Sequence, residues 1–206
     1  MTGKDKKISK NIAYFLFSIF FLIGLLTFRD YGMWSEETFQ RFSGFYWLNY
    51  VLSFTYFDEL KNITALKIDQ IIDFTIQNPK YYPYYGVIFV LPAAFLELIF
   101  QIEDSKNYFY LRHFLNFTFF FVGSIFFYKL LLNRFSNYNV SLIGTLFFVL
   151  SPRIYGNSFY NNKDVVFLSL ITIALYYSFK ALDKPSYKNL LIFSIFAALA
   201  TSSRIL

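Results

Sequence analysis

The chain contains no cysteine and only one histidine, and these shortages exclude several kinds of site. Without cysteine there can be no disulfide, no thiolate metal ligand and no cysteine nucleophile. His113 has no metal-ligand partner at helical spacing, so we expect it to form a hydrogen bond inside the protein. A glycine-rich phosphate loop and a Ser, His and Asp set are also missing. The basic residues are dispersed among apolar stretches, which argues against nucleic acid as a partner.

Charged residues are scarce as well, at 16% of the chain, whereas soluble proteins carry about 25%. Hydrophobic residues make up 56% and aromatic residues 24%. A chain of 206 residues cannot bury so much apolar surface in water, because small domains leave much of their surface exposed. We therefore predict a single membrane domain over residues 1–206, with an all-α fold that forms a polytopic transmembrane helix bundle.

Apolar runs predict the helices that cross the membrane. The first run, Asn11 to Phe28, follows a lysine-rich start and ends at Arg29. It is long enough to span and no small-residue cleavage site follows it, so we interpret it as an uncleaved span rather than a signal peptide. Further apolar runs lie at about 86–101, 110–132, 139–152, 165–179 and 189–203. A span needs about 20 apolar residues, and the run at 86–101 is short and contains Pro92 and Glu97.

The positions of Lys and Arg decide between two topologies. If every run crossed, the basic residues at 129–134 and 180–188 would face outward. If 86–101 instead lies in the outer interface or re-enters, these residues join the N-terminal lysines in the cytoplasm, as the positive-inside rule requires. This second topology gives about five spans. It places 29–109 outside as one long loop with interfacial helices.

The long outer loop is expected to be helical rather than disordered. Asp58 is predicted to be the N-cap of a helix. Apolar residues recur after it in a loosely helical pattern. Asn78-Pro79 is expected to end that helix. The tyrosines between 81 and 85 favour the headgroup layer of the membrane. Two or three helices are therefore predicted to lie on the outer membrane surface.

Two acidic clusters fall on the same side of the membrane in this topology. Glu36-Glu37 follows the first span directly, and Asp164 precedes a later one. Carboxylates held against the outer face of a membrane protein suggest chemistry on a lipid-borne substrate. In the rejected topology the two clusters would lie in different compartments and could not share a site.

Three segments carry a resemblance to a known family. Gly32 to Arg41 resembles the first outer-loop signature of the GT-C glycosyltransferases. Tyr110 to Phe117 resembles the Arg-led start of their second span. Leu150 to Asp164 resembles their second outer loop, where a further Asp precedes the next span. The most similar branch contains protein O-mannosyltransferases and the lipid A transferases for aminoarabinose or galacturonic acid (glycosyltransferase families 39 and 83). The resemblance covers nearly the whole chain.

The resemblance implies a glycosyltransferase that moves a sugar from a polyprenyl-phosphate donor to an acceptor lipid, glycan or protein at the outer face. The implied catalytic residues are Glu36, Glu37 and Asp164, with Glu36 as the general base for the acceptor hydroxyl. The leaving phosphate needs cations. Four are placed at the outer membrane level by the chosen topology: Arg112, Arg153, Lys163 and Arg204.

No metal or other cofactor is expected. Glu36 and Asp164 could hold a divalent ion through oxygen ligands, but the branch that uses monophosphate donors generally does without one. Each candidate also has a purely structural interpretation. Asp164 could cap the next helix, and the candidate cations could snorkel to lipid headgroups. Trp34 could anchor the chain in the interface.

Two departures from the family favour an alternative function. The family usually has Asp at the position of Glu36, and the added methylene moves the carboxylate oxygens by roughly an ångström. Family members also run to several hundred residues, so we expect this chain to be the N-terminal part of such a module. The alternative is a non-catalytic or degenerate membrane protein that binds or transports a lipid carrier. The motifs favour the bacterial plasma membrane over the endoplasmic reticulum.

Overall fold

The computed structural model describes residues 3–75 and 86–204, and every regular element within them is an α-helix. The predicted all-α fold is thereby confirmed. The helices are α1 (Gly3–Thr27), α2 (Glu37–Leu52), α3 (Asp58–Thr75), α4 (Val87–Ile99), α5 (Ser105–Phe135), α6 (Tyr138–Val149), α7 (Pro152–Tyr160), α8 (Asp164–Asp183) and α9 (Tyr187–Ser203). The predicted helix stop at Asn78-Pro79 and the tyrosines between 81 and 85 lie outside the described residues.

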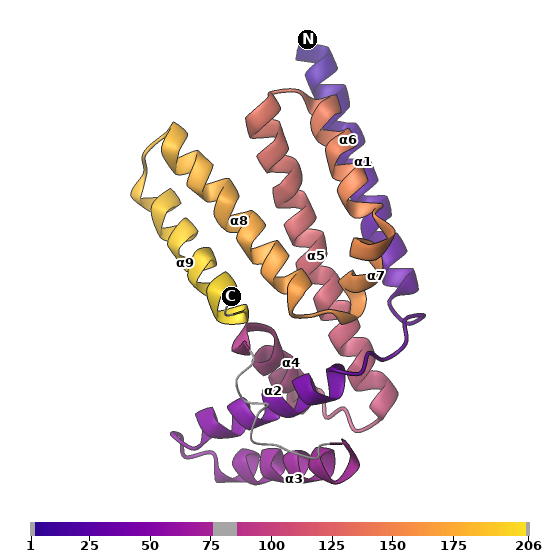
Figure 1. The fold of residues 1–206 in the computed structure, drawn as a ribbon, viewed down its shortest axis with the longest axis vertical. Helices are drawn as coiled ribbons and strands as arrows, with labels where there is room; N and C mark the ends of the chain where they lie inside the picture. The colour runs from indigo at the N-terminus through magenta and orange to yellow at the C-terminus, as the bar shows by residue number, and fades with distance from the viewer. Residues whose placement is uncertain (1–2, 76–85, 205–206) are drawn as a thin grey trace.

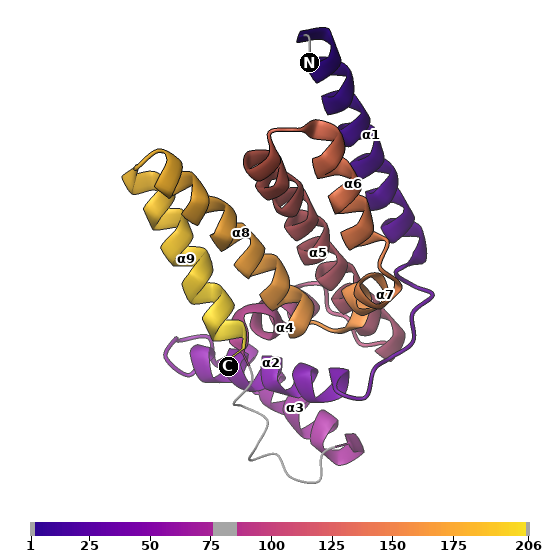
Figure 2. The same ribbon diagram turned by 45° about the horizontal axis from the view of Figure 1, so that its top comes forward.

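The helices form a bundle with a separate group at one end. Helices α1, α5, α6, α8 and α9 lie side by side, whereas α2, α3 and α4 gather below them (Figures 1 and 2). The chain reaches this α2–α4 end along α1, leaves it along α5 and returns along α6. It leaves again along α8 and returns along α9 (Figure 1). The links at 136–137 and 184–186 therefore lie at the opposite end, called the far end below.

Three of the described helices are long and apolar enough to cross a membrane: α1 from Ser9 onward, α5 and α8. Helix α6 has 12 residues, so it rises about 18 Å against a hydrocarbon core of about 30 Å. Helix α9, with 17 residues, is just below the usual length. Three of the expected five spans are thus supported by length and composition, and the crossing of the membrane by α6 and α9 stays a prediction. Helix α4, which covers most of the run 86–101, lies with α2 and α3 at one end of the bundle (Figure 1). Its expected place in the outer interface stays a prediction.

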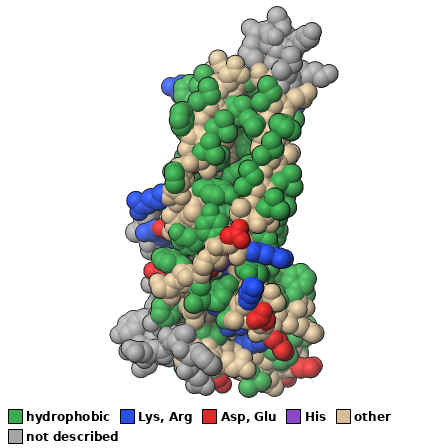
Figure 3. Space-filling model, turned by 90° about the vertical axis from the view of Figure 1, so that its right-hand side faces the viewer, with side chains coloured by type: hydrophobic (Ala, Val, Ile, Leu, Met, Phe, Trp, Pro, Cys, Tyr) green, Lys and Arg blue, Asp and Glu red, His purple; other side chains and the backbone are tan. Residues whose placement is uncertain are grey.

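Large apolar side chains on the outside of the bundle point to lipid as the solvent. Leu26 on α1, Phe147 on α6 and Leu182 on α8 are each at least three quarters exposed. Figure 3 shows one face of the molecule, with hydrophobic side chains along the bundle and many of its Asp, Glu, Lys and Arg side chains toward the α2–α4 end. Contiguous apolar surface of this kind marks a membrane or interaction surface. The chain is a membrane protein.

Local sequence signals explain several helix ends. Asp58, predicted as an N-cap, is the first residue of α3. The apolar run at 139–152 does not continue as one helix, because Pro152 begins the separate helix α7. Proline is favoured at a first helical position, where its missing N–H costs nothing. Ser136 ends α5 in the left-handed conformation, at φ 51°.

Aromatic packing fixes the short helix α7 against the bundle. The ring of Phe159 is fully buried and lies parallel to Phe117 of α5, with 5.2 Å between ring centroids. Tyr31, from the segment after α1, stacks on the same ring at 4.1 Å. The segment after α1 and the helix α7 are thereby both held next to α5.

Helix α2 crosses α4 closely at Gly44. A Cβ atom on Gly44 would lie 2.4 Å from the backbone oxygen of Val90, a contact that a flexible side chain cannot relieve. Gly44 therefore allows the two backbones to approach, and it sets the position of α2 relative to α4.

We expect Gly44→Ala to destabilise the protein by about 1–3 kcal/mol, because the backbones must separate to admit the methyl group. Chemical unfolding in detergent micelles, followed by helical circular dichroism, measures the change. Gly32→Ala is the matched control, since a Cβ atom on Gly32 would meet nothing within 4 Å, and it should change stability by less than about 0.5 kcal/mol. Equal effects of the two substitutions would contradict the close crossing.

Candidate functional site

A buried carboxylate at the start of α2 connects this helix to α5. Glu37 is 1% exposed, and its Oε1 lies 3.0 Å from Nε2 of His113 on α5. Its Oε2 accepts a hydrogen bond from the backbone N–H of Trp34 at 2.8 Å. The other ring nitrogen of His113 lies 3.3 Å from the backbone oxygen of Phe28. These contacts fix the segment between α1 and α2, and they confirm the expected internal role of His113.

A second buried carboxylate, Glu97 of α4, lies between two arginines. Arg41 of α2 donates to Glu97 from Nε at 2.9 Å and from Nη2 at 2.5 Å. Arg112 of α5 forms an ion pair with the other oxygen, at 3.5 Å. Glu97 and Arg112 are each 1% exposed. The Arg41 guanidinium also lies over the Tyr108 ring at the start of α5, 3.7 Å from its centroid. Helices α2, α4 and α5 thus share one buried ionic network.

Arg41 and Glu97 were not among the predicted site residues. One signal could have indicated the network: Glu97 is a single carboxylate within an apolar run. An ionisable residue at such a position needs a partner. The partner of Glu97 could not be identified from spacing, since Arg41 lies 56 residues earlier in the chain.

The remaining predicted carboxylates lie at the surface, each paired with a cation. Glu36 forms an ion pair with Lys163, and Asp164 forms one with Arg204. Because Lys163 and Asp164 are adjacent, the two pairs join into one row of alternating charge. The side chains of Glu36 and Asp164 are 39% and 53% exposed. The structure therefore brings Glu36 and Asp164, from distant parts of the sequence, to the same end of the bundle.

Asp164 is not the N-cap of α8 but its first residue. Its backbone N–H donates to the side-chain oxygen of Asn161 at 3.1 Å, and its Oδ2 accepts from the amide nitrogen of Asn161 at 3.1 Å. A carboxylate in the first turn is favoured by the helix dipole. Lys163 is the N-cap residue of α8 and its side chain does not cap the helix. The Asp164 N–H is satisfied by Asn161, and the Asp164 carboxylate is left at the surface beside Arg204.

Two of the predicted cations lie apart from this row of charges. Arg153 is exposed in the first turn of α7, and none of the ion pairs among the described residues includes it. Arg112 is buried in the network with Glu97. The phosphate-binding role assigned to each stays a prediction.

Aromatic side chains form a wall near Glu36. The ring of Trp34 lies 6.2 Å from that of Tyr160 at the end of α7, and Tyr31 lies 6.4 Å from the same ring. Burial, followed by the neighbouring phenols Tyr155 and Tyr160, raises the pKa of Tyr31. Its hydroxyl therefore stays protonated at neutral pH. The partly buried ring of Trp34, two residues before Glu36, thus meets the end of α7.

The described residues contain no group of three or more His, Asp or Glu side chains placed to hold a metal ion. The arrangement instead offers a half-exposed carboxylate, a second carboxylate and two cations on one surface. Such a set can accept a proton from a hydroxyl and can bind a phosphate.

Comparison with known proteins gave one family match. Residues 81–206 match the family model described as dolichyl-phosphate-mannose-protein mannosyltransferase. The matched range includes Arg112, Lys163, Asp164 and Arg204, whereas Glu36 precedes it. The searches of curated proteins and of solved structures gave no match.

The buried network generates a stability prediction. Glu97→Gln leaves Arg41 and Arg112 buried without a counter-charge, which should destabilise the protein by about 3–5 kcal/mol. Thermal and chemical unfolding in detergent measure the loss. Glu103→Gln is the control, because Glu103 is exposed and lies just after α4, and it should stay within about 0.5 kcal/mol of the parent. A Glu97→Gln protein as stable as the Glu103→Gln protein would show that the network contributes nothing.

Proposed function

The chain belongs to the dolichyl-phosphate-mannose-protein mannosyltransferase family, whose members are glycosyltransferases, and we propose that it transfers a sugar from a polyprenyl-phosphate donor to an acceptor hydroxyl. The observation that carries this proposal is the row of Glu36, Lys163, Asp164 and Arg204 on one surface. The α2–α4 end then faces outward, and the membrane is the bacterial plasma membrane. The acceptor is a lipid, a glycan or a protein.

The proposed reaction is a displacement at the anomeric carbon. The acceptor oxygen forms a bond to that carbon as the bond to the phosphate oxygen breaks, and the polyprenyl phosphate leaves with the bonding electrons. Glu36 takes the proton of the acceptor hydroxyl as general base, a contribution of typically about 10²–10⁴-fold. Its side chain is partly exposed, so an acceptor can reach it from the surface.

Lys163 and Arg204 are proposed to bind the leaving phosphate. Each now forms an ion pair with a carboxylate. A donor phosphate bound between them would replace these contacts and leave Glu36 free to act as a base. Arginine binds phosphate through two parallel hydrogen bonds and lysine through a point charge. Arg153, exposed on α7, is proposed as a third cation for the phosphate of the donor.

Glu37 and Asp164 are proposed to have different roles. Glu37 is buried and holds the backbone of Trp34, so it acts as a positioning residue for the turn that carries Glu36. Asp164 lies at the surface and would bind an acceptor hydroxyl or orient Glu36. No metal ion is required in this scheme.

A second candidate function is binding of the lipid carrier without sugar transfer. It is favoured by Glu36, which stands where the family usually has Asp. It is also favoured by the family match, which begins at residue 81 and so does not include Glu36. Donor binding and sugar transfer must therefore be measured separately.

The test uses a panel of radiolabelled polyprenyl-phosphate sugars with membranes that contain the complete gene product. We expect Glu36→Gln to lower kcat by about 10²–10⁴-fold while donor binding is retained. Glu36→Asp should retain activity, because it keeps the carboxylate. Lys163→Met should instead weaken donor binding.

Glu59→Gln on the exposed face of α3 is the matched control and should transfer sugar at the parental rate. Full transfer by Glu36→Gln would exclude Glu36 as the base. Donor binding by the parent protein without transfer of any sugar in the panel would favour the second function.

A further inference from the structure

A groove at the far end of the bundle has the chemistry of a lipid headgroup site. It lies between α1, α5 and α6 and has a volume of about 290 Å³. Lys10 and Lys129 line it together with Tyr14, Tyr128 and Tyr138, and the remaining lining side chains are apolar. The groove is at the opposite end of the bundle from α2, which Glu36 precedes (Figure 1).

The charge of this groove is positive. Among the residues whose side chains the structure describes, no carboxylate lines it. Neither of its lysines is in an ion pair within the part of the chain that the structure describes. The ammonium of Lys10 lies 5.6 Å from the Tyr14 ring centroid, and that of Lys129 lies 4.4 Å from the Phe126 centroid. Both cations therefore remain available for an anion.

The wall of the groove also contains a polar group without a partner. The Tyr128 hydroxyl is buried and has no hydrogen bond among the described residues. A buried hydroxyl without a partner costs free energy that a hydrogen bond would recover. Tyr128 lines the same groove as Lys10 and Lys129, so its hydroxyl is a candidate donor to an oxygen acceptor bound there.

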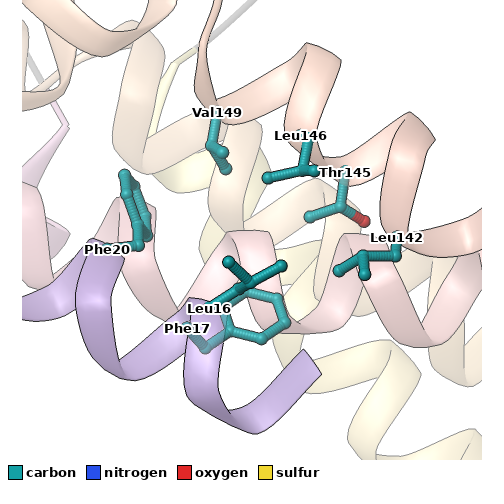
Figure 4. A pocket seen from close by; sticks show the side chains of 7 residues that line it. All are labelled: Leu16, Phe17, Phe20, Leu142, Thr145, Leu146 and Val149. Atoms are coloured by element: carbon teal, nitrogen blue, oxygen red, sulfur yellow. The ribbon is translucent and has the colours of Figure 1, made fainter. Parts of the chain in front are cut away.

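The seam between α1 and α6 contains a second cavity that lacks these features. It is lined by Leu16, Phe17, Phe20, Leu142, Thr145, Leu146 and Val149 (Figure 4). Its volume of about 20 Å³ is little more than one water-sized sphere, and it has no charged side chain. The difference shows that the lysines and tyrosines of the larger groove are a local feature and not a general property of the seam.

We propose that the groove at the far end binds the headgroup of an anionic membrane phospholipid, with its phosphate held by Lys10 and Lys129. The apolar side chains of the wall would contact the first part of the acyl chains. Tyrosine and lysine are the side chains that favour the depth of the headgroups. The volume of about 290 Å³ lies just below the range for ligand pockets, about 300–1,000 Å³, which suits part of a lipid rather than a whole ligand. This lipid is a bound structural partner and is distinct from the sugar donor at the other end.

Native mass spectrometry of the detergent-solubilised chain tests the proposal. The probes are phosphatidylglycerol and phosphatidylcholine with identical acyl chains. We expect preferential retention of phosphatidylglycerol. Each of Lys10→Gln and Lys129→Gln should weaken it by about fivefold, which is the factor for one basic residue near an anionic headgroup. Tyr128→Phe should weaken it by about tenfold through loss of a hydrogen bond to a charged group.

Lys180→Gln is the matched control. Lys180 lies at the same end, 5.8 Å from the ring centroids of Tyr176 and Tyr177, but it does not line the groove. It should leave phosphatidylglycerol binding unchanged. Inorganic phosphate should not compete with the lipid, because the acyl chains contribute to binding.

Several results would overturn the proposal. Equal retention of the two lipids would exclude recognition of the headgroup charge. An equal loss with Lys180→Gln would show that the effect comes from net charge, and competition by inorganic phosphate would show a simple anion site. If Tyr128→Phe binds phosphatidylglycerol as well as the parent does, the Tyr128 hydroxyl does not contact the lipid. Melting temperatures measured without added lipid, which should be close to the parental value for all four variants, exclude misfolding as the cause.

Discussion

The position of the candidate site depends on one buried carboxylate, Glu97, and the two arginines that contact it. The helices α2, α4 and α5 could slide against one another if only apolar surface joined them, because apolar contacts are not directional. A buried ion pair does fix the relative position of two helices, because separating a buried charge from its partner costs about 3–5 kcal/mol. Arg41 and Arg112 each bring a different helix to Glu97, and Glu37 adds a contact from α2 to His113 of α5. Glu36 lies between Trp34 and Glu37, and the Glu37 side chain accepts a hydrogen bond from the backbone N–H of Trp34. The position of the proposed base is therefore fixed by contacts in the interior.

Interior and surface charges have different functions in this protein. The interior pairs are buried, and they set the positions of the helices that they join. The surface pairs, Glu36 with Lys163 and Asp164 with Arg204, are open to solvent, where an ion pair contributes at most about 1 kcal/mol. A weakly held pair can be exchanged for a pair with a substrate phosphate. A rigid support with exchangeable groups at its surface suits a site that binds and releases a charged lipid.

Much of this arrangement could be predicted from the sequence. Length and hydropathy indicate the long helices α1, α5 and α8, and the distribution of Lys and Arg indicates that α4 stays at one end. The same topology places Glu36 and Asp164 together. The sequence does not show the buried network, because the pairing of Arg41 with Glu97 depends on how α2 crosses α4 at Gly44. The sequence places Arg112 at the outer membrane level but does not show that its side chain is buried, since an arginine near the start of a span can face either lipid headgroups or the interior.

The most direct test of the account is the compartment of each end of the bundle. Single cysteines at Ser35, Asp164, Asn137 and Lys184 can be labelled without background, because the chain has no cysteine of its own. An impermeant maleimide added to intact cells should label positions 35 and 164, and should label 137 and 184 only after the membrane is opened. If positions 35 and 164 react from opposite sides of the membrane, the shared site does not exist and the proposed glycosyl transfer at this surface is wrong.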